Sequence, residues 1–201
     1  MSQVMHRGAE DKYRDFAALS RAEHEDVDFD IVCRARSSTV AVIAPHGGKI
    51  ESSTAEIAAA VAGDDFNLYC FRGLKSRNNT SLHITSGRFD EPRCRALLSA
   101  CDHVVAIHGC AAGNRTTFLG GLDAELRDAI GDHLEAAGFR TDIHPDPRLQ
   151  GISTDSICNK GRSRRGVQPE LSRDLRNELM DDGDALARLA AAVRAALTRR
   201  E

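Results

Sequence analysis

Two short apolar runs constrain the fold of this chain more than any other feature of its sequence. They are Thr39–Ala44 (TVAVIA), which stops at Pro45, and His103–His108 (HVVAIH), which stops at Gly109. A half-exposed strand alternates apolar and polar residues, whereas a strand covered on both faces reads as a continuous apolar run. The two runs therefore predict buried strands in the middle of an α/β sheet.

The rest of the chain alternates between strand-like and helix-like patterns, without repeats. Further strands are predicted at Asp28–Arg36, near a sheet edge, and at Asn67–Phe71, Phe139–Ile143 and Gly166–Glu170. Helices are predicted at Tyr13–Glu25, Ser53–Gly63 (opened by the capping box Ser53–Glu56), Glu91–Ala100, Leu122–Ala137, Leu171–Met180 and Asp184–Thr198. This order predicts a single α/β domain over residues 1–201, with an open, mixed, mostly parallel sheet flanked by helices. Residues 1–10 are expected to form a flexible tail.

Composition argues against several classes of partner. The 27 basic and 30 acidic residues give a formal net charge of −3, and the chain has no Trp, so no nucleic-acid partner is expected. No run reaches the roughly 18 apolar residues of a membrane span, and residues 1–12 lack the apolar core of a signal peptide. We therefore expect no membrane partner and a cytoplasmic location, with release by lysis if the protein acts outside the cell.

The six cysteines are expected to be buried, reduced thiols.

Two histidines and a glutamate stand where the buried strands end. His46 and Glu51 lie in the segment APHGGKIE directly after the first run, and His108 ends the second run. In open α/β sheets, ligands collect at the carboxyl ends of the strands. If the two strands are parallel neighbours, these side chains converge, and two histidines with one glutamate can hold a catalytic zinc ion. Each residue alone could equally be a turn histidine or a capping carboxylate, so spacing leaves both interpretations open.

Three stretches have no clear periodicity and are candidates for functional loops: 72–88, 109–121 and 144–165. Arg88 and Arg162 lie in two of them and would suit a ligand that bears a carboxylate, or belong to solvated basic loops. His83 is either a proton donor near the site or a core histidine. Glu170, between a predicted strand and a helix, could face the same cleft or could simply favour the helix start.

Five segments, in this order along the chain, carry a resemblance to a known family. They are APHGGKIE (44–51), LHITSGRFDEP (82–92), AIHGC (106–110), GGLD (120–123) and ICNKGRSRRGVQPELS (157–172). The chain resembles the phage- and bacillus-type poly-γ-glutamate hydrolases from about Asp11 to Arg176. Several motifs in series are far more specific than any one of them.

The resemblance implies a fold similar to that of zinc carboxypeptidases and an enzyme that hydrolyses γ-glutamyl amide bonds of poly-γ-glutamate. It implies one zinc ion with three protein ligands, which are His46, Glu51 and His108. It also implies Glu170 as the carboxylate that takes a proton from the attacking water and returns it to the leaving amine. Three residues are carried over as substrate-site candidates only, namely His83, Arg88 and Arg162.

Two alternatives stay open beside an anionic polymer substrate. The same ligands could serve small N-acyl amino acids or γ-glutamyl peptides, because a ligand set does not specify what fills the pocket. A non-catalytic metal-binding relative would keep the fold and lose the reaction. The chain departs from the family pattern at Lys160, where arginine is expected, and at Pro169, which removes a backbone donor and could alter the strand pairing that directs Glu170.

Overall fold

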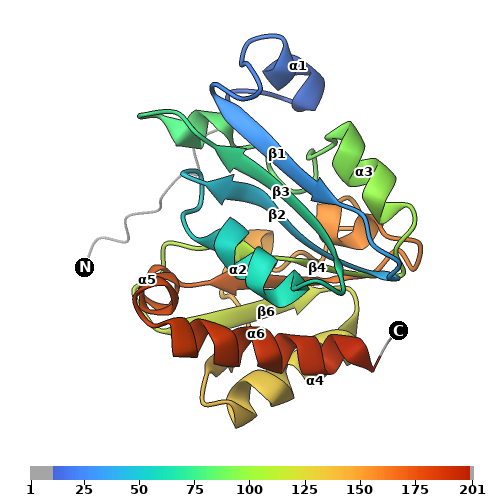
Figure 1. The fold of residues 1–201 in the computed structure, drawn as a ribbon, viewed down its shortest axis with the longest axis vertical. Coiled ribbons are helices and arrows are strands. Elements are labelled where there is room, and N and C mark those ends of the chain that lie inside the picture. The colour runs from blue at the N-terminus through green and yellow to red at the C-terminus, as the bar shows by residue number, and fades with distance from the viewer. Residues whose placement is uncertain (1–10, 200–201) are drawn as a thin grey trace.

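In the computed structural model, which describes residues 11–199, helices lie on both sides of one sheet (Figure 1). The strands are β1 (Phe29–Arg34), β2 (Val40–Gly48), β3 (Asn67–Gly73), β4 (His103–Ala106), β5 (His108–Gly109), β6 (Thr116–Gly121), β7 (Arg140–Asp142) and β8 (Val167–Leu171). The α-helices are α1 (Phe16–Ser20), α2 (Thr54–Ala62), α3 (Pro92–Leu98), α4 (Ala124–Ala136), α5 (Arg173–Asp181) and α6 (Gly183–Thr198). None of these helices is long and apolar enough to cross a bilayer. The tail predicted for residues 1–10 lies outside the described part of the chain.

The strands lie in the order β1-β3-β2-β4-β8-β6-β7, and β5 pairs with β8. β2 runs parallel to β3 and β4, and β4 runs parallel to β8, whereas β1 and β6 pair antiparallel with β3 and β8. The predicted mixed, mostly parallel sheet is therefore confirmed, with β1 at its edge. Val40 pairs with His103 and Ile43 with Ala106, so the two apolar runs are parallel neighbours.

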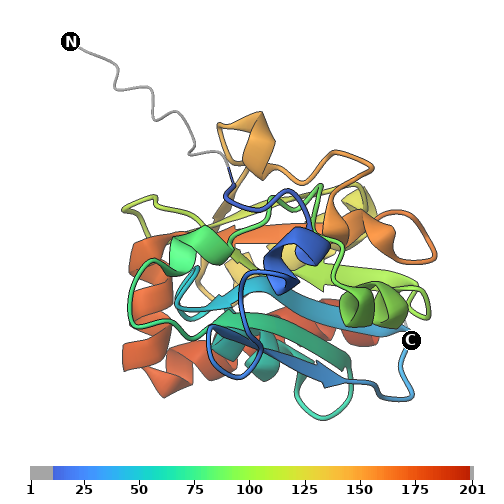
Figure 2. The ribbon, with the colours of Figure 1, turned by 90° about the horizontal axis from the view of Figure 1, so that it is seen from above.

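Both faces of the sheet are covered, which explains why the two runs are apolar throughout. On one face, residues of α2, α4, α5 and α6 share one core with Val40, Val42 and Ala44 of β2 (Figure 1). On the other face, α1 and α3 belong to the core that contains Ala41 and Ile43 (Figure 2). Alternate residues of a strand point to opposite faces, so successive positions of β2 enter two different cores.

The first helix and the first buried strand differ in length from their predictions. The first helix is confined to α1, where Asp15 caps it by accepting a hydrogen bond from Ala18 N. Strand β2 continues through Pro45 to Gly48, because a register shift against β3 between Ala44 and Gly47 accommodates the missing N–H of proline.

Strand β6 was not predicted, because it falls within 109–121, which was expected to be irregular. Its sequence TTFLGG ends in two glycines that are typical of a loop. In the structure these glycines allow other backbone segments to approach closely. A Cβ on Gly120 would lie 2.1 Å from Gln150 O, and one on Gly121 would lie 2.1 Å from Gly166 O. The remaining irregular stretches contain three short 3-10 helices, η1 (Asn79–Leu82), η2 (Pro147–Leu149) and η3 (Ile157–Lys160).

Two local predictions are wrong. Ser53 does not form a capping box, because it has a φ of 75° and its side chain makes no capping hydrogen bond. Instead, Thr54 Oγ1 donates to Glu51 O at 2.8 Å, which joins the start of α2 to the preceding loop. Cys33 is exposed near the end of the edge strand, whereas the other five cysteines are buried, and all six are free thiols.

Candidate metal centre

The carboxyl end of β2 forms a tight turn that brings Glu51 back beside His46. Gly48 has a φ of 62°, and a Cβ there would lie 2.6 Å from Gly73 O, so this position requires glycine. Glu51 N donates to His46 O at 2.8 Å. The turn therefore fixes Glu51 relative to the strand, and the bond from Thr54 fixes it relative to α2.

The carboxyl ends of the strands bring together His46, Glu51 and His108. β2 and β5, which carries His108, run in the same direction, because β2 is parallel to β4 and both β4 and β5 are parallel to β8. Their ligand atoms all lie within 4.8 Å of one another. His46 and His108 are only 1% and 2% exposed. His46 Nδ1 lies 3.0 Å from Glu51 Oε1, and His108 Nδ1 lies 3.6 Å from Glu51 Oε2. On its other side, His108 Nε2 lies 3.3 Å from Ser86 Oγ.

The hydrogen bonds of His46 fit a metal ligand. His46 Nε2 lies 2.9 Å from Ile84 O, which can only accept, so Nε2 carries a proton and Nδ1 is the nitrogen that would present a lone pair to a metal ion. Nδ1 faces the Glu51 carboxylate, and a proton or a cation must lie between these two atoms. Gly109 N donates to the other Glu51 oxygen at 2.9 Å and orients it. Two imidazoles and one carboxylate are a donor set that fits zinc.

Two carboxyl groups at this site have pKa values moved in opposite directions. Burial alone would raise the pKa of Glu51, but the charge of His46 and the nearby imidazole of His108 outweigh it and hold the pKa well below its ordinary value. Burial, and then the negative charge of Glu51, raise the pKa of Glu170 well above its ordinary value. Neighbouring carboxyl groups that differ in this way are typical of sites where one group binds and another transfers protons.

Strand β8 places Glu170 next to His108, with which it is in register. Glu170 is 3% exposed, and its Oε1 accepts a hydrogen bond from Gln168 Nε2 at 3.0 Å. Pro169 does not break β8. β4 pairs with β8 at Val167 and β5 pairs with it at Glu170, so the gap between β4 and β5 lies opposite Pro169, which has no N–H to donate.

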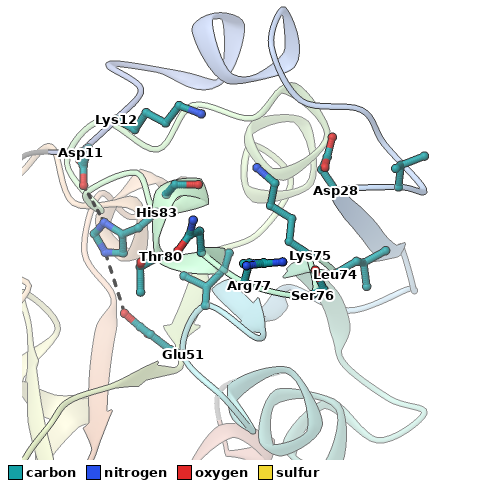
Figure 3. Close-up of a pocket in the computed structure, with 14 residues that line it drawn as sticks. Asp11, Lys12, Asp28, Glu51, Leu74, Lys75, Ser76, Arg77, Thr80 and His83 are labelled. Carbon is teal, nitrogen blue, oxygen red and sulfur yellow. Dashed lines mark hydrogen bonds and ion pairs between the residues drawn. The ribbon is translucent and has the colours of Figure 1, made fainter.

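His83 lies at the rim of the site and is half-buried rather than part of the core. Its Nε2 lies 3.9 Å from Glu51 Oε1 (Figure 3), and its ring centroid lies 4.0 Å from that of His46. The charge of His46, followed by burial, lowers the pKa of His83 to about 4. The ring is therefore neutral at pH 7.

Asp11 orients His83 and was not predicted to have a role. Asp11 Oδ1 accepts a hydrogen bond from His83 Nδ1 at 2.7 Å (Figure 3). Its second oxygen accepts hydrogen bonds from Thr85 N at 2.7 Å and from Arg88 Nη2 at 2.5 Å. Arg88 therefore reaches the site through Asp11 and His83. No local pattern predicts a contact between residues 72 positions apart.

Arg162 is not brought to this site. Its backbone N donates to Cys101 O at 2.7 Å, and its guanidinium pairs with Asp102 at 2.6 Å. Both contacts lie at the amino end of β4, whereas His46 and His108 lie at the carboxyl ends of their strands. The connection that leads into β8 thus passes the amino ends of the central strands, opposite the candidate metal centre.

Arg176 holds the loops around the site through hydrogen bonds to their backbone, a role that was also not predicted. Its Nε donates to Leu171 O and its Nη2 to Cys110 O, both at 3.2 Å, and its Nη1 donates to Ser52 O. This buried guanidinium ties the loop after Glu51 to the loop after β5. Only its helical spacing, three residues before the buried Leu179, marks it in the sequence.

Comparison with known proteins identifies relatives of this chain. The family model described as poly-gamma-glutamate hydrolase matches residues 13–195. YndL of Bacillus subtilis is 35% identical over 172 residues, which cover 85% of this chain and 68% of YndL. Both matches include the loop after β2 and the strand that carries Glu170.

Solved structures give the same assignment. A bacteriophage poly-gamma-glutamate hydrolase superposes with a TM-score of 0.89, and a zinc-free structure of YndL superposes with a TM-score of 0.88. Each is 30% identical and covers 94% of this chain and 98% of its own. A provisionally assigned carboxypeptidase from Burkholderia mallei, 14% identical, covers 85% of this chain and 59% of its own at a TM-score of 0.51, which confirms the carboxypeptidase-like fold alone. This chain belongs to the poly-gamma-glutamate hydrolase family.

Proposed function

We propose that this protein is a zinc-dependent hydrolase that cleaves the γ-glutamyl amide bonds of poly-γ-glutamate. The observation that carries the proposal is the convergence of His46, Glu51 and His108 within 4.8 Å, with the buried Glu170 on the adjoining strand. Membership of the family supports the substrate, and the zinc-free form of YndL supports the metal. The three converging side chains would hold one zinc ion.

Glu170 would move the proton that the reaction requires. A bound zinc ion would supply positive charge for the scissile carbonyl oxygen and for the attacking water. Glu170 accepts a proton from the water as its oxygen bonds to the carbonyl carbon. It then delivers this proton to the leaving nitrogen as the C–N bond breaks, which yields a carboxylic acid and an amine. The raised pKa of Glu170 suits a group that holds a proton between these two events.

His83 would orient the substrate. An aspartate oxygen can only accept a hydrogen bond, so the bond to Asp11 fixes the His83 proton on Nδ1. Nε2 is then an acceptor on the site side of the ring, suited to an amide N–H of the substrate. Arg88 would act indirectly, by holding Asp11. Arg162, at the opposite edge of the sheet, is not part of this proposal.

The test is depolymerisation of poly-γ-glutamate by the zinc-loaded protein, followed as chain length against time. We expect the parent protein to shorten the polymer and the variant His46→Ala to leave it intact. His24→Ala is the matched control, since His24 is exposed and is neither a candidate ligand nor a residue that lines the pocket beside the site. It should bind zinc and shorten the polymer as the parent does.

Two results would contradict the proposal. If the parent binds stoichiometric zinc and does not shorten the polymer, the substrate is wrong. A panel of N-acyl amino acids and short γ-glutamyl peptides, assayed with the same preparation, would then identify a small-molecule amidohydrolase. If His46→Ala shortens the polymer at the parental rate, the metal centre is wrong.

A further inference from the structure

A large pocket opens beside the candidate metal centre. It has a volume of about 1110 Å³ and is lined by the loop 74–81, by the start of the described chain and by the approach to β1. Figure 3 shows Glu51 and His83 on one side of this pocket and Asp28 on the other. A substrate bound at the metal centre can therefore extend into the pocket.

One wall of the pocket carries two lysines that share a single carboxylate. Glu23 is 6% exposed and accepts hydrogen bonds from Lys75 Nζ at 2.5 Å, Tyr13 Oη at 2.5 Å and Lys12 Nζ at 3.0 Å. Burial alone would raise the pKa of Glu23, but these bonds outweigh it and lower the pKa to about 2. The carboxylate is therefore ionised and holds both ammonium groups in place, which leaves one positive charge uncompensated.

Arg77 adds a second uncompensated positive charge. It is exposed on the loop that follows β3 and lines the pocket. Among residues 11–199 its guanidinium has neither a hydrogen-bond partner nor an ion-pair partner. Two nearby arginines differ, because Arg72 pairs with Asp30 and Arg88 pairs with Asp11.

The acidic residues of the pocket are largely occupied or remote. Asp11 is held by His83, Thr85 and Arg88. Asp28 accepts a hydrogen bond from His24 N at 2.8 Å and lies away from Glu51 in Figure 3. The third acidic residue of the lining, Glu51, is a candidate metal ligand, and Asp28 keeps its charge because its partner is a backbone N–H. The pocket therefore offers an anion the free guanidinium of Arg77 beside two lysines that share Glu23.

We propose that this pocket binds the free α-carboxylate of a γ-glutamyl unit next to the scissile bond, and that Arg77 is a specificity-determining residue. The inference rests on the proposed function and adds how the site distinguishes γ-linked glutamate from amides that carry no charge beside the scissile bond. A γ-linked chain keeps one free α-carboxylate on every unit, whereas most amides carry no anion there. A guanidinium recognises a carboxylate through two parallel hydrogen bonds, which Lys75 and Lys12 would reinforce.

The experiment compares two substrates that differ only in this charge. One is a short γ-glutamyl oligomer with free α-carboxylates, and the other has those carboxylates amidated. The zinc-loaded parent is compared with Arg77→Gln, with the conservative Arg77→Lys, and with Arg188→Gln, a control that changes an exposed arginine on α6. For the charged oligomer, we expect Arg77→Gln to raise KM about tenfold with kcat nearly unchanged, and Arg77→Lys to restore part of the loss. For the amidated oligomer, all four proteins should be equal.

The outcomes separate this inference from the proposed function. If the parent cleaves the oligomer and Arg77→Gln has the same KM as Arg188→Gln, the pocket assignment is overturned while the function stands. An equal loss on both substrates overturns it as well, since charge would not be what Arg77 recognises. If the parent cleaves neither oligomer, the function fails, and calorimetric titration with the intact charged oligomer tests the pocket by itself. Binding about tenfold weaker to Arg77→Gln would then support it, and equal binding would overturn it.

Discussion

The two ends of the central strands use polar side chains in opposite ways. At the amino ends, Arg162 pairs with Asp102 at the surface, and Asn67 Nδ2 donates to two backbone carbonyls at 2.8 Å. At the carboxyl ends, two imidazoles and one carboxylate converge so that their ligand atoms lie within 4.8 Å of one another. Both ends belong to the same well-packed sheet. The difference teaches that a binding site is found where the fold brings several metal-ligand donors together, and not wherever polar residues gather.

The largest effect is expected when one of the converging ligands is removed. His108→Ala leaves two ligands where a catalytic zinc ion needs three, so zinc should be lost and turnover should fall by about a thousandfold or more. Metal content by mass spectrometry and polymer length against time would measure both effects. Stoichiometric zinc in His108→Ala would remove this residue from the ligand set and weaken the contrast between the two strand ends.

Glu170→Gln should separate proton transfer from metal binding. The substitution keeps the size of the side chain and its contact with Gln168 but cannot carry the proton. We expect zinc to stay bound and kcat to fall by about 10²–10⁴-fold, as for the loss of a general base. Unchanged turnover with zinc bound would exclude Glu170 as the proton carrier.

The turn after β2 should be sensitive to a single methyl group. Gly48→Ala places a Cβ 2.6 Å from Gly73 O at a φ of 62°, so we expect the free energy of unfolding to fall by about 2–3 kcal/mol. Gly183→Ala is the matched control, because a Cβ there meets nothing within 4 Å. That control should be neutral or slightly stabilising. Urea unfolding of both variants measures the difference, and equal stabilities would show that the turn is not strained.

Much of the fold and the metal centre could be predicted, because both depend on local patterns. The apolar runs fixed the central strands, and parallel neighbours bring their carboxyl ends together, so His46, Glu51 and His108 converge. Glu170 depended on the family resemblance, since its spacing alone favoured an ordinary helix start. The position of Glu170 beside His108 became clear only from the pairing of β5 with β8.

The remainder depends on contacts between distant parts of the chain. Strand β6 was missed because its glycines serve the close approach of Gln150 and Gly166, which no window of sequence contains. Asp11 was missed for the same reason. Arg162 was placed at the substrate because its segment is basic, but local charge does not indicate the edge of the sheet past which a loop runs. The cytoplasmic location stays a prediction.

The pocket wall should be sensitive to acid through Glu23. Its pKa in the folded protein is about 2, below the ordinary value of 4.5, so its ionised form stabilises the fold above about pH 4.5. That contribution is lost as the pH falls from 4.5 toward 2. The metal-free parent should therefore exceed metal-free Glu23→Gln in free energy of unfolding at pH 6, and the difference should shrink by pH 3. A constant difference across this range would show that the lysines do not stabilise the Glu23 carboxylate.

The smallest effect is expected at the amino ends of the strands, where the charged side chains of Arg162 and Asp102 are paired and exposed to solvent. Arg162 and Asp102 have side chains that are 53% and 40% exposed, and such an ion pair contributes little to stability because water and salt screen it. Arg162→Ala should therefore leave zinc content and turnover unchanged and shift the urea midpoint only slightly. If turnover instead fell about tenfold, which corresponds to about 1.4 kcal/mol of transition-state binding, the substrate would have to reach both edges of the sheet. The contrast between the two strand ends would then describe packing and not function.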